Sequence, residues 1–148
     1  MLTQTLKTLF RRELEKLKKE IASYKDETKL WAVEKGIANS AGNLCLHLIG
    51  NLNNYIGKEL GGTGYIRNRD LEFSQKDIPR LELLKKIDET ILVVENALDK
   101  LTIQQLEEEY PAPVFNYTMT TGFFLVHLTA HLTYHLGQIN YHRRFLDI

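Results

Sequence analysis

The chain has little cysteine, no net charge and no long apolar run. Each absence excludes a class of protein or of binding partner. Its one cysteine, Cys45, cannot form an internal disulfide, which fits a reducing cytoplasm. Lysine plus arginine and aspartate plus glutamate each number 19, so a nucleic acid or an anionic membrane is not an expected partner. No apolar run reaches the roughly 18 residues of a membrane span. Residues 1–20 are too charged for a secretory signal. We therefore expect a cytoplasmic protein.

Nothing in the sequence divides the chain, because it has no internal repeat, low-complexity tract or linker rich in proline and glycine. We expect a single domain over residues 1–148. Apolar residues recur at intervals of three and four, and period-two alternation is absent. Four segments have this helical pattern: 2–24, 40–60 with Ser40 as N-cap, 77–101, and 122–145 with Thr120 or Thr121 as N-cap. Residues 61–77 and 102–120 are predicted to be irregular, apart from a helical turn near 104–109. The pattern predicts an all-α four-helix bundle with long crossover connections.

Histidines recur every fourth residue near the end of the chain, at His127, His131 and His135. At about 100° per residue, the three fall on one face of the predicted last helix. The same face carries apolar and aromatic residues, including Tyr134 and Phe145, so we expect it to point inward. A buried imidazole needs a partner for each nitrogen. A metal ion satisfies this need directly, and the alternative is a row of core histidines that are hydrogen-bonded without metal.

The axial spacing limits how many of these histidines can share one ion. His127 and His135 are about 12 Å apart along the helix, too far for both to reach an ion at a bond length of about 2 Å. Neighbours at i and i+4 can chelate. The spacing therefore leaves two candidate pairs, His127 with His131 and His131 with His135. His142 lies about two turns further along the helix and is not expected to join either pair.

A third ligand must come from another segment, and His47 is the remaining histidine. It shares a polar stripe of the predicted second helix with Asn43, Asn51 and Asn54. The stripe either faces solvent with an incidental histidine or lines a wet cavity in the bundle. No glutamate stands three residues before a histidine, as in di-iron bundles. The HExxH motif of zinc proteases is also missing. A three-histidine site with water in the open positions is what remains.

Two motifs resemble the DinB-like (YfiT-like) superfamily of metal-binding four-helix bundles. They are HLTYHLGQ at residues 131–138 and NLCLHLIGN at residues 43–51. The longer strings NSAGNLCLHLIGNLNNYIG, GGTGYIRNRDLEFS and MTTGFFLVHLTAHLTYHLGQINYHRR are similar to an uncharacterised bacterial subgroup, so the resemblance covers nearly the whole chain. It implies that His47, His131 and His135 bind one divalent ion, nickel, zinc or iron. It leaves His127 and His142 outside this triad.

The resemblance also implies what such a site does. Characterised members include metal-dependent transferases that use a low-molecular-weight thiol such as bacillithiol or mycothiol, and members are often homodimers. We therefore expect a metal-dependent thiol transferase or, alternatively, a non-catalytic metal-binding dimer with a stress-related role. His127, Asn51, Tyr134, Gln138 and Arg67 are expected to line the pocket, with Arg67 suited to an anionic group of the substrate.

Overall fold

The structure, a computed structural model, describes residues 1–148 and is all-helical, as the sequence predicts. The long helices are α1 (Leu2–Ala22), α2 (Ala41–Leu52), α4 (Arg80–Asp99) and α6 (Thr121–Leu146). The shorter elements are a 3₁₀ helix η1 (Glu27–Trp31), a π-helical continuation of α2 named η2 (Asn53–Lys58), α3 (Arg69–Ser74) and α5 (Ile103–Glu107). None of these helices combines the length and apolar character needed to cross a membrane.

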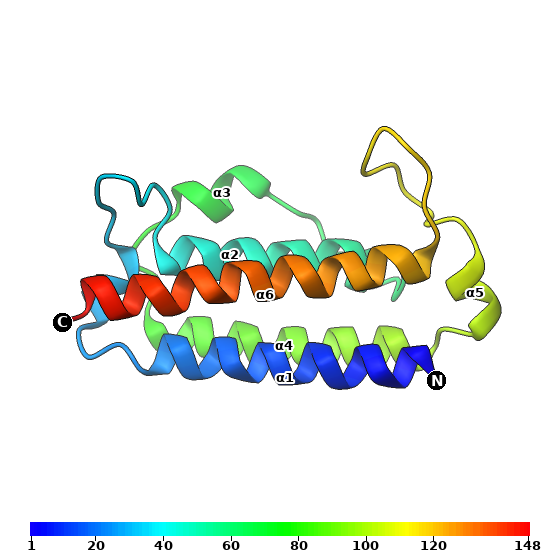
Figure 1. Ribbon diagram of the computed structural model, residues 1–148, viewed down its shortest axis with the longest axis horizontal. Helices are drawn as coiled ribbons and strands as arrows, with labels where there is room; N and C mark the ends of the chain where they lie inside the picture. Colours follow the sequence, from blue (N-terminus) through cyan, green and yellow to red (C-terminus); the bar gives the residue numbers. More distant parts are fainter.

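The four long helices form two layers, with α2 and α6 in one and α1 and α4 in the other (Figure 1). Helices α1 and α6 run in one direction, and α2 and α4 run in the other (Figure 1). Because α2 and α4 are parallel, the connection between them has to return along the length of the bundle. Residues 59–79 make this crossover, and α3 lies within it against α2. The topology is therefore not a simple up-and-down bundle.

The core lies between the two layers and consists of 30 buried hydrophobic residues in one cluster. Helix α1 contributes residues at intervals of three and four, which is the amphipathic pattern of its sequence. Helix α2 is buried over its whole length. Its polar stripe therefore faces the interior, with His47 and Asn51 each 6% exposed. The interpretation of this stripe as a solvent-facing surface is wrong for Asn43, His47 and Asn51.

The predicted helix starts are confirmed at both helices that carry the histidines. Ser40 Oγ accepts the backbone N–H of Asn43 at 3.1 Å, and Thr120 Oγ1 accepts that of Phe123 at 3.1 Å. Each side chain satisfies one of the N–H groups that a helix end leaves without a partner. The two N-caps thus fix where α2 and α6 begin.

The prediction of an irregular segment over residues 61–77 is wrong, because α3 forms within it. Asn68 caps this short helix by accepting the backbone N–H of Leu71 at 3.2 Å. Asn43 of α2 then anchors the helix, since its side-chain N–H groups donate to the carbonyl oxygens of Glu72 and Gln75 at 3.0 and 2.8 Å. So short a helix depends on tertiary contacts rather than on its own propensity, which is why periodicity does not reveal it.

The inward face of α6 is rotated from the predicted one. Its buried residues include Leu128, Leu132, Leu136 and Ile139. By contrast, Tyr134 and Phe145 are 65% and 62% exposed, so the prediction that they point inward is wrong. The core stripe of α6 is centred on the leucines rather than on the histidine row. His131 and His135 consequently lie half-buried at the boundary between core and solvent, and His127 is exposed.

The end of α6 is tied to the segment that follows α1. His142 Nε2–H donates to the carbonyl oxygen of Ala32 at 2.8 Å, and the Tyr24 hydroxyl donates to His142 Nδ1 at 2.7 Å. The Asp147 carboxylate accepts two backbone N–H groups of the same segment. Both ring nitrogens of His142 are therefore satisfied, and this histidine has a structural role away from the triad.

Candidate metal centre

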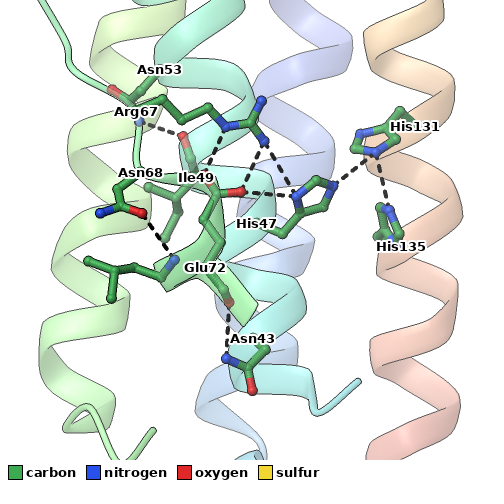
Figure 2. Close-up of polar contacts among 10 residues, drawn as sticks. Asn43, His47, Ile49, Asn53, Arg67, Asn68, Glu72, His131 and His135 are labelled. Carbon is green, nitrogen blue, oxygen red and sulfur yellow. Dashed lines mark hydrogen bonds and ion pairs between the residues drawn. The ribbon is translucent and has the colours of Figure 1, made fainter. Parts of the chain in front are cut away.

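Three histidine side chains from two helices meet at the boundary between core and surface (Figure 2). His47 projects from α2, and His131 and His135 project from successive turns of α6. The Nε2 atom of His131 lies 3.2 Å from that of His47 and 3.1 Å from that of His135. One ligand atom from each residue lies within 4.8 Å of the others. The structure thus brings together the pair and the third residue that the resemblance implied.

The two Nε2 separations from His131 suit a single ion. Histidine nitrogens bind zinc at about 2.0–2.1 Å, which places two such nitrogens about 3.3 Å apart at a tetrahedral angle. The observed separations of 3.1 and 3.2 Å need little adjustment to reach this value. Three protein ligands leave one position of a four-coordinate ion open, as in catalytic rather than structural zinc sites.

The outer nitrogen of His47 is held by Glu72 of α3. His47 Nδ1 lies 3.1 Å from Glu72 Oε1, and Arg67 donates to both oxygens of this carboxylate at 2.9 Å (Figure 2). Burial raises the pKa of Glu72, but hydrogen bonds from His47 and Arg67 outweigh it and hold the pKa below its usual value. Because a carboxylate only accepts, Nδ1 carries the proton and Nε2 presents its lone pair to the site.

Glu72 reaches His47 across a glycine of α2. A Cβ atom at Gly50 would lie 2.5 Å from Glu72 Cδ and closer still to Oε2, so a larger residue there displaces the carboxylate. The ring of Phe73 also packs on the His47 imidazole, with 4.9 Å between centroids. Helix α3 therefore fixes the orientation of His47 through both a carboxylate and an aromatic ring.

The outer nitrogen of His135 has a partner on its own helix. His135 Nδ1 lies 2.7 Å from Gln138 Oε1, and Gln138 Nε2 donates to the Tyr134 hydroxyl at 3.4 Å. The amide oxygen can only accept, so Nδ1 of His135 carries the proton and its Nε2 lone pair also faces the site. Of the residues predicted to line the pocket, Gln138 thus contacts a member of the triad, and Tyr134 contacts Gln138 on the exposed side of α6.

Hydrogen bonds among the three imidazoles cannot satisfy all of them. Two lone pairs, on Nε2 of His47 and of His135, face Nε2 of His131. A single N–H on His131 can donate to one of these neighbours and leaves the other without a donor. In addition, His131 Nδ1 is buried with no partner. A cation interacts with all three lone pairs at once. The lone pair that would stay without a donor therefore favours a metal site over a metal-free histidine cluster.

The protonation states of the pair on α6 are those that metal binding needs. Burial lowers the pKa of His131 from 6.5 to about 4, and repulsion from His135 and His47 acts in the same direction. Burial also lowers the pKa of His135, against the effect of its hydrogen bond to Gln138. His131 is therefore neutral at physiological pH, with a lone pair available to an ion.

The other residues predicted to line the pocket have separate positions around the triad. Arg67 is half-buried, is paired with the carboxylate of α3, and lies over the Tyr55 ring at 5.5 Å from its centroid. His127 is exposed and stacks on Phe124, with 5.8 Å between ring centroids. Asn51 is buried on α2, and its Oδ1 atom has no hydrogen-bond partner. His127 takes no part in the triad.

Glu72 and Gly50 belong to the site, and neither was predicted as a site residue, although both lie within the strings that carry the resemblance. A local signal existed for each. Asn68 followed by acidic residues is a typical helix start and marks α3. A glycine inside an apolar helical pattern often marks a close approach by another group, here the Glu72 carboxylate.

A family model described as "Protein of unknown function (DUF1572)" matches residues 2–147. The match includes all six α-helices and the three histidines of the triad. No curated protein matches the chain.

The depressed pKa of His131 predicts how the stability of the metal-free protein depends on pH. Since the folded state holds this pKa near 4 against 6.5 for the free side chain, the unfolded state binds the proton more readily between these values. The free energy of unfolding should therefore fall as the pH drops from 6.5 to about 4. Urea denaturation in the presence of a chelator measures it.

The matched control is His131→Asn, which keeps a polar side chain but cannot titrate. As the pH drops from 6.5 to about 4, the natural protein should lose more unfolding free energy than this variant. The difference in unfolding free energy between the two proteins should therefore shrink. An NMR titration of the His131 ring gives the midpoint directly. A midpoint at the ordinary value of 6.5 would contradict the prediction.

Proposed function

The chain belongs to the DUF1572 family of proteins of unknown function, and from its histidine site we propose that it binds one divalent metal ion. The convergence of three Nε2 atoms carries this proposal. DUF1572 is in the DinB-like superfamily, which agrees with the resemblance of the two histidine motifs. Three imidazoles without thiolate or carboxylate ligands suit zinc, nickel or iron(II).

Metal binding should depend on the triad and not on the neighbouring histidine. Protein purified without a histidine tag should contain up to one divalent ion per chain, and His47→Ala, His131→Ala and His135→Ala should each lose it. His127→Ala is the matched control on the same helix and should keep the ion. At a free zinc concentration about 100-fold above Kd, binding should stabilise the natural protein by about 2.7 kcal/mol.

Elemental analysis measures the ion content, and isothermal titration calorimetry measures the affinity. Thermal melting with and without chelator reports the stabilisation. Equal metal content in the natural protein and in His131→Ala would rule out the ligand assignment. Equal losses in His127→Ala and His131→Ala would point instead to general binding by the histidine-rich helix.

We further propose that the site transfers a low-molecular-weight thiol of the bacillithiol type to an electrophile. The resemblance supplies the thiol chemistry, and the count of three protein ligands supports an open position. A divalent ion at such a position lowers the pKa of a bound thiol. The chain itself offers no thiol for this purpose, because Cys45 is fully buried in the core and burial raises its pKa to about 12.

The residues of the chain have defined tasks in such a transfer. His47, His131 and His135 hold the ion, while Glu72 and Gln138 keep two of these imidazoles in the tautomer that exposes Nε2. In the net reaction the thiol sulfur forms a bond to the electrophilic carbon. The leaving group departs with the electron pair of its own bond, and the thiol proton passes to solvent.

Thiol consumption tests this second proposal. Zinc- or nickel-loaded protein should accelerate the loss of bacillithiol in the presence of a chlorinated aromatic electrophile, and His131→Ala should reduce the rate to the background. Mass spectrometry should detect the thioether product. If the loaded protein shows no acceleration with bacillithiol, mycothiol or glutathione, the non-catalytic alternative, a metal-binding dimer, takes the place of the transferase.

We also propose that two copies of the chain associate through the outer face of α6. This face carries exposed apolar residues along most of the helix, namely Phe123, Val126, Tyr134, Tyr141 and Phe145. Gly137 lies among them, and a Cβ there would meet nothing within 4 Å, so another backbone can approach closely. A two-fold axis near Gly137 would cover this face with its own copy, because the same patch serves both subunits.

Light scattering measures the mass in solution and should give a dimer for the natural protein. Tyr141→Glu introduces a charge within the contact, one turn from the proposed two-fold axis, and should shift the equilibrium towards monomer. Leu81→Glu, at an 80% exposed position on α4, is the matched control and should leave the dimer intact. A monomeric natural protein, or equal effects of the two substitutions, would exclude this interface.

A further inference from the structure

The three ligand imidazoles differ in what holds their outer nitrogens. His47 Nδ1 has the Glu72 carboxylate, and His135 Nδ1 has the Gln138 amide oxygen. His131 Nδ1 is buried and has no partner. When an imidazole binds an ion through Nε2, its Nδ1 carries a proton that needs an acceptor, and metal-binding histidines almost always have one. A metal-bound His131 would therefore need an acceptor for its Nδ1–H, and none of the hydrogen bonds described above supplies one.

A second buried side-chain atom lacks a partner, and it is an acceptor. This atom is Oδ1 of Asn51. It and His131 Nδ1 are the two buried side-chain nitrogen or oxygen atoms that have no hydrogen-bond partner. Asn51 is 6% exposed, so water does not freely solvate its amide oxygen. A buried acceptor left without a donor costs about 1–3 kcal/mol. Both unsatisfied atoms belong to residues of the two helices that form the metal site.

Contacts on either side of Asn51 show which part of α6 it faces. One turn before it, His47 Nε2 lies 3.2 Å from His131 Nε2. One turn after it, the Tyr55 ring packs on Phe124, with 5.1 Å between centroids. Residues at i and i+4 share one helix face, and Tyr55 stays near the face of Asn51 although it belongs to the π-helical continuation η2. The side chain of Asn51 is therefore bracketed by contacts to positions 124 and 131 of α6.

The direction of the helices selects His131 rather than His135 as its neighbour. Helices α2 and α6 are antiparallel, so passing from His47 to Asn51 along α2 means moving towards the N-terminal end of α6 (Figure 1). His131 is the triad member on that side, since it precedes His135 by one turn. The unsatisfied acceptor and the unsatisfied ring nitrogen thus lie on the same side of the site.

We propose that Asn51 is the positioning residue for His131, with its Oδ1 accepting the Nδ1–H of the metal-bound ring directly or through one bridging water. The inference rests on the metal site proposed above and extends it. Each ligand histidine then has its own acceptor: a carboxylate for His47 and an amide oxygen for each of the other two. Metal binding at Nε2 fixes the proton of His131 on Nδ1. The unsatisfied donor on His131 and the unsatisfied acceptor on Asn51 would then share one hydrogen bond.

Substitution of Asn51 separates this role from a purely structural one. Asn51→Leu removes the acceptor at similar volume and should lower zinc affinity about ten-fold or more, the usual effect of losing such a partner. It should not lower the melting temperature of the metal-free protein, because there the amide oxygen makes no bond that could be lost. Asn51→Asp keeps an acceptor and should retain the affinity. Asn54→Leu, at a half-buried asparagine of the same helical segment, is the matched control.

Calorimetry with zinc on untagged protein gives the affinities, and nitrogen-15 NMR of the zinc-loaded protein observes the ring protons. The natural protein should show three Nδ1–H signals protected from exchange with water, and Asn51→Leu should lose the one assigned to His131. Zinc affinity in Asn51→Leu equal to that in Asn54→Leu would overturn the inference and leave the metal site intact. Parallel losses of affinity and of metal-free stability would overturn it in favour of a structural role. Failure of the natural protein to bind zinc would overturn the metal site itself.

Discussion

An imidazole that binds a metal through one nitrogen must give the proton on the other to an acceptor, and the architecture around the proposed metal-binding triad fits this constraint. His135 meets it locally, through Gln138 one turn further along α6. His47 meets it through Glu72, which lies 25 residues away in sequence. The partner of His47 can reach it because the crossover between α2 and α4 returns along α2 and not over the end of the bundle.

The crossover shows how a buried carboxylate is kept charged without a solvent shell. Glu72 and Arg67 have side chains only 7% and 12% exposed, and a buried charge is tolerated when it is paired and hydrogen-bonded. The guanidinium binds both carboxylate oxygens, so it is already committed within the protein. The role that the structure supports for Arg67 is therefore to keep Glu72 ionised and oriented towards His47. Gly50 serves the same end by leaving room for the carboxylate.

The sequence predicted the long helices and both caps because these depend on local periodicity and on side chains next to the helix ends. It could not choose between the two histidine pairs of α6, since helical spacing treats His127 and His135 alike. Tertiary placement decides, because the core stripe of α6 runs through its leucines and turns His127 outward. The periodicity of the sequence did not reveal helix α3, because a hydrogen bond from Asn43 of another helix holds it in place. The acceptor Glu72 was missed with it, since it reaches the site only once the crossover is in place.

The position of the triad bears on whether the proposed metal ion would be structural or functional. Small domains that need a metal to fold lack a sufficient core, and their apo forms are unfolded. Here a cluster of 30 buried hydrophobic residues joins all the long helices without any of the triad histidines. The imidazoles of α6 lie half-buried at the edge of that cluster, and three protein ligands would leave a coordination position of the proposed ion free. Because this core does not include the triad, an ion bound at the proposed site would add to stability through its own binding free energy. The position of the triad thus fits the proposed functional ion better than an ion needed to hold the bundle together.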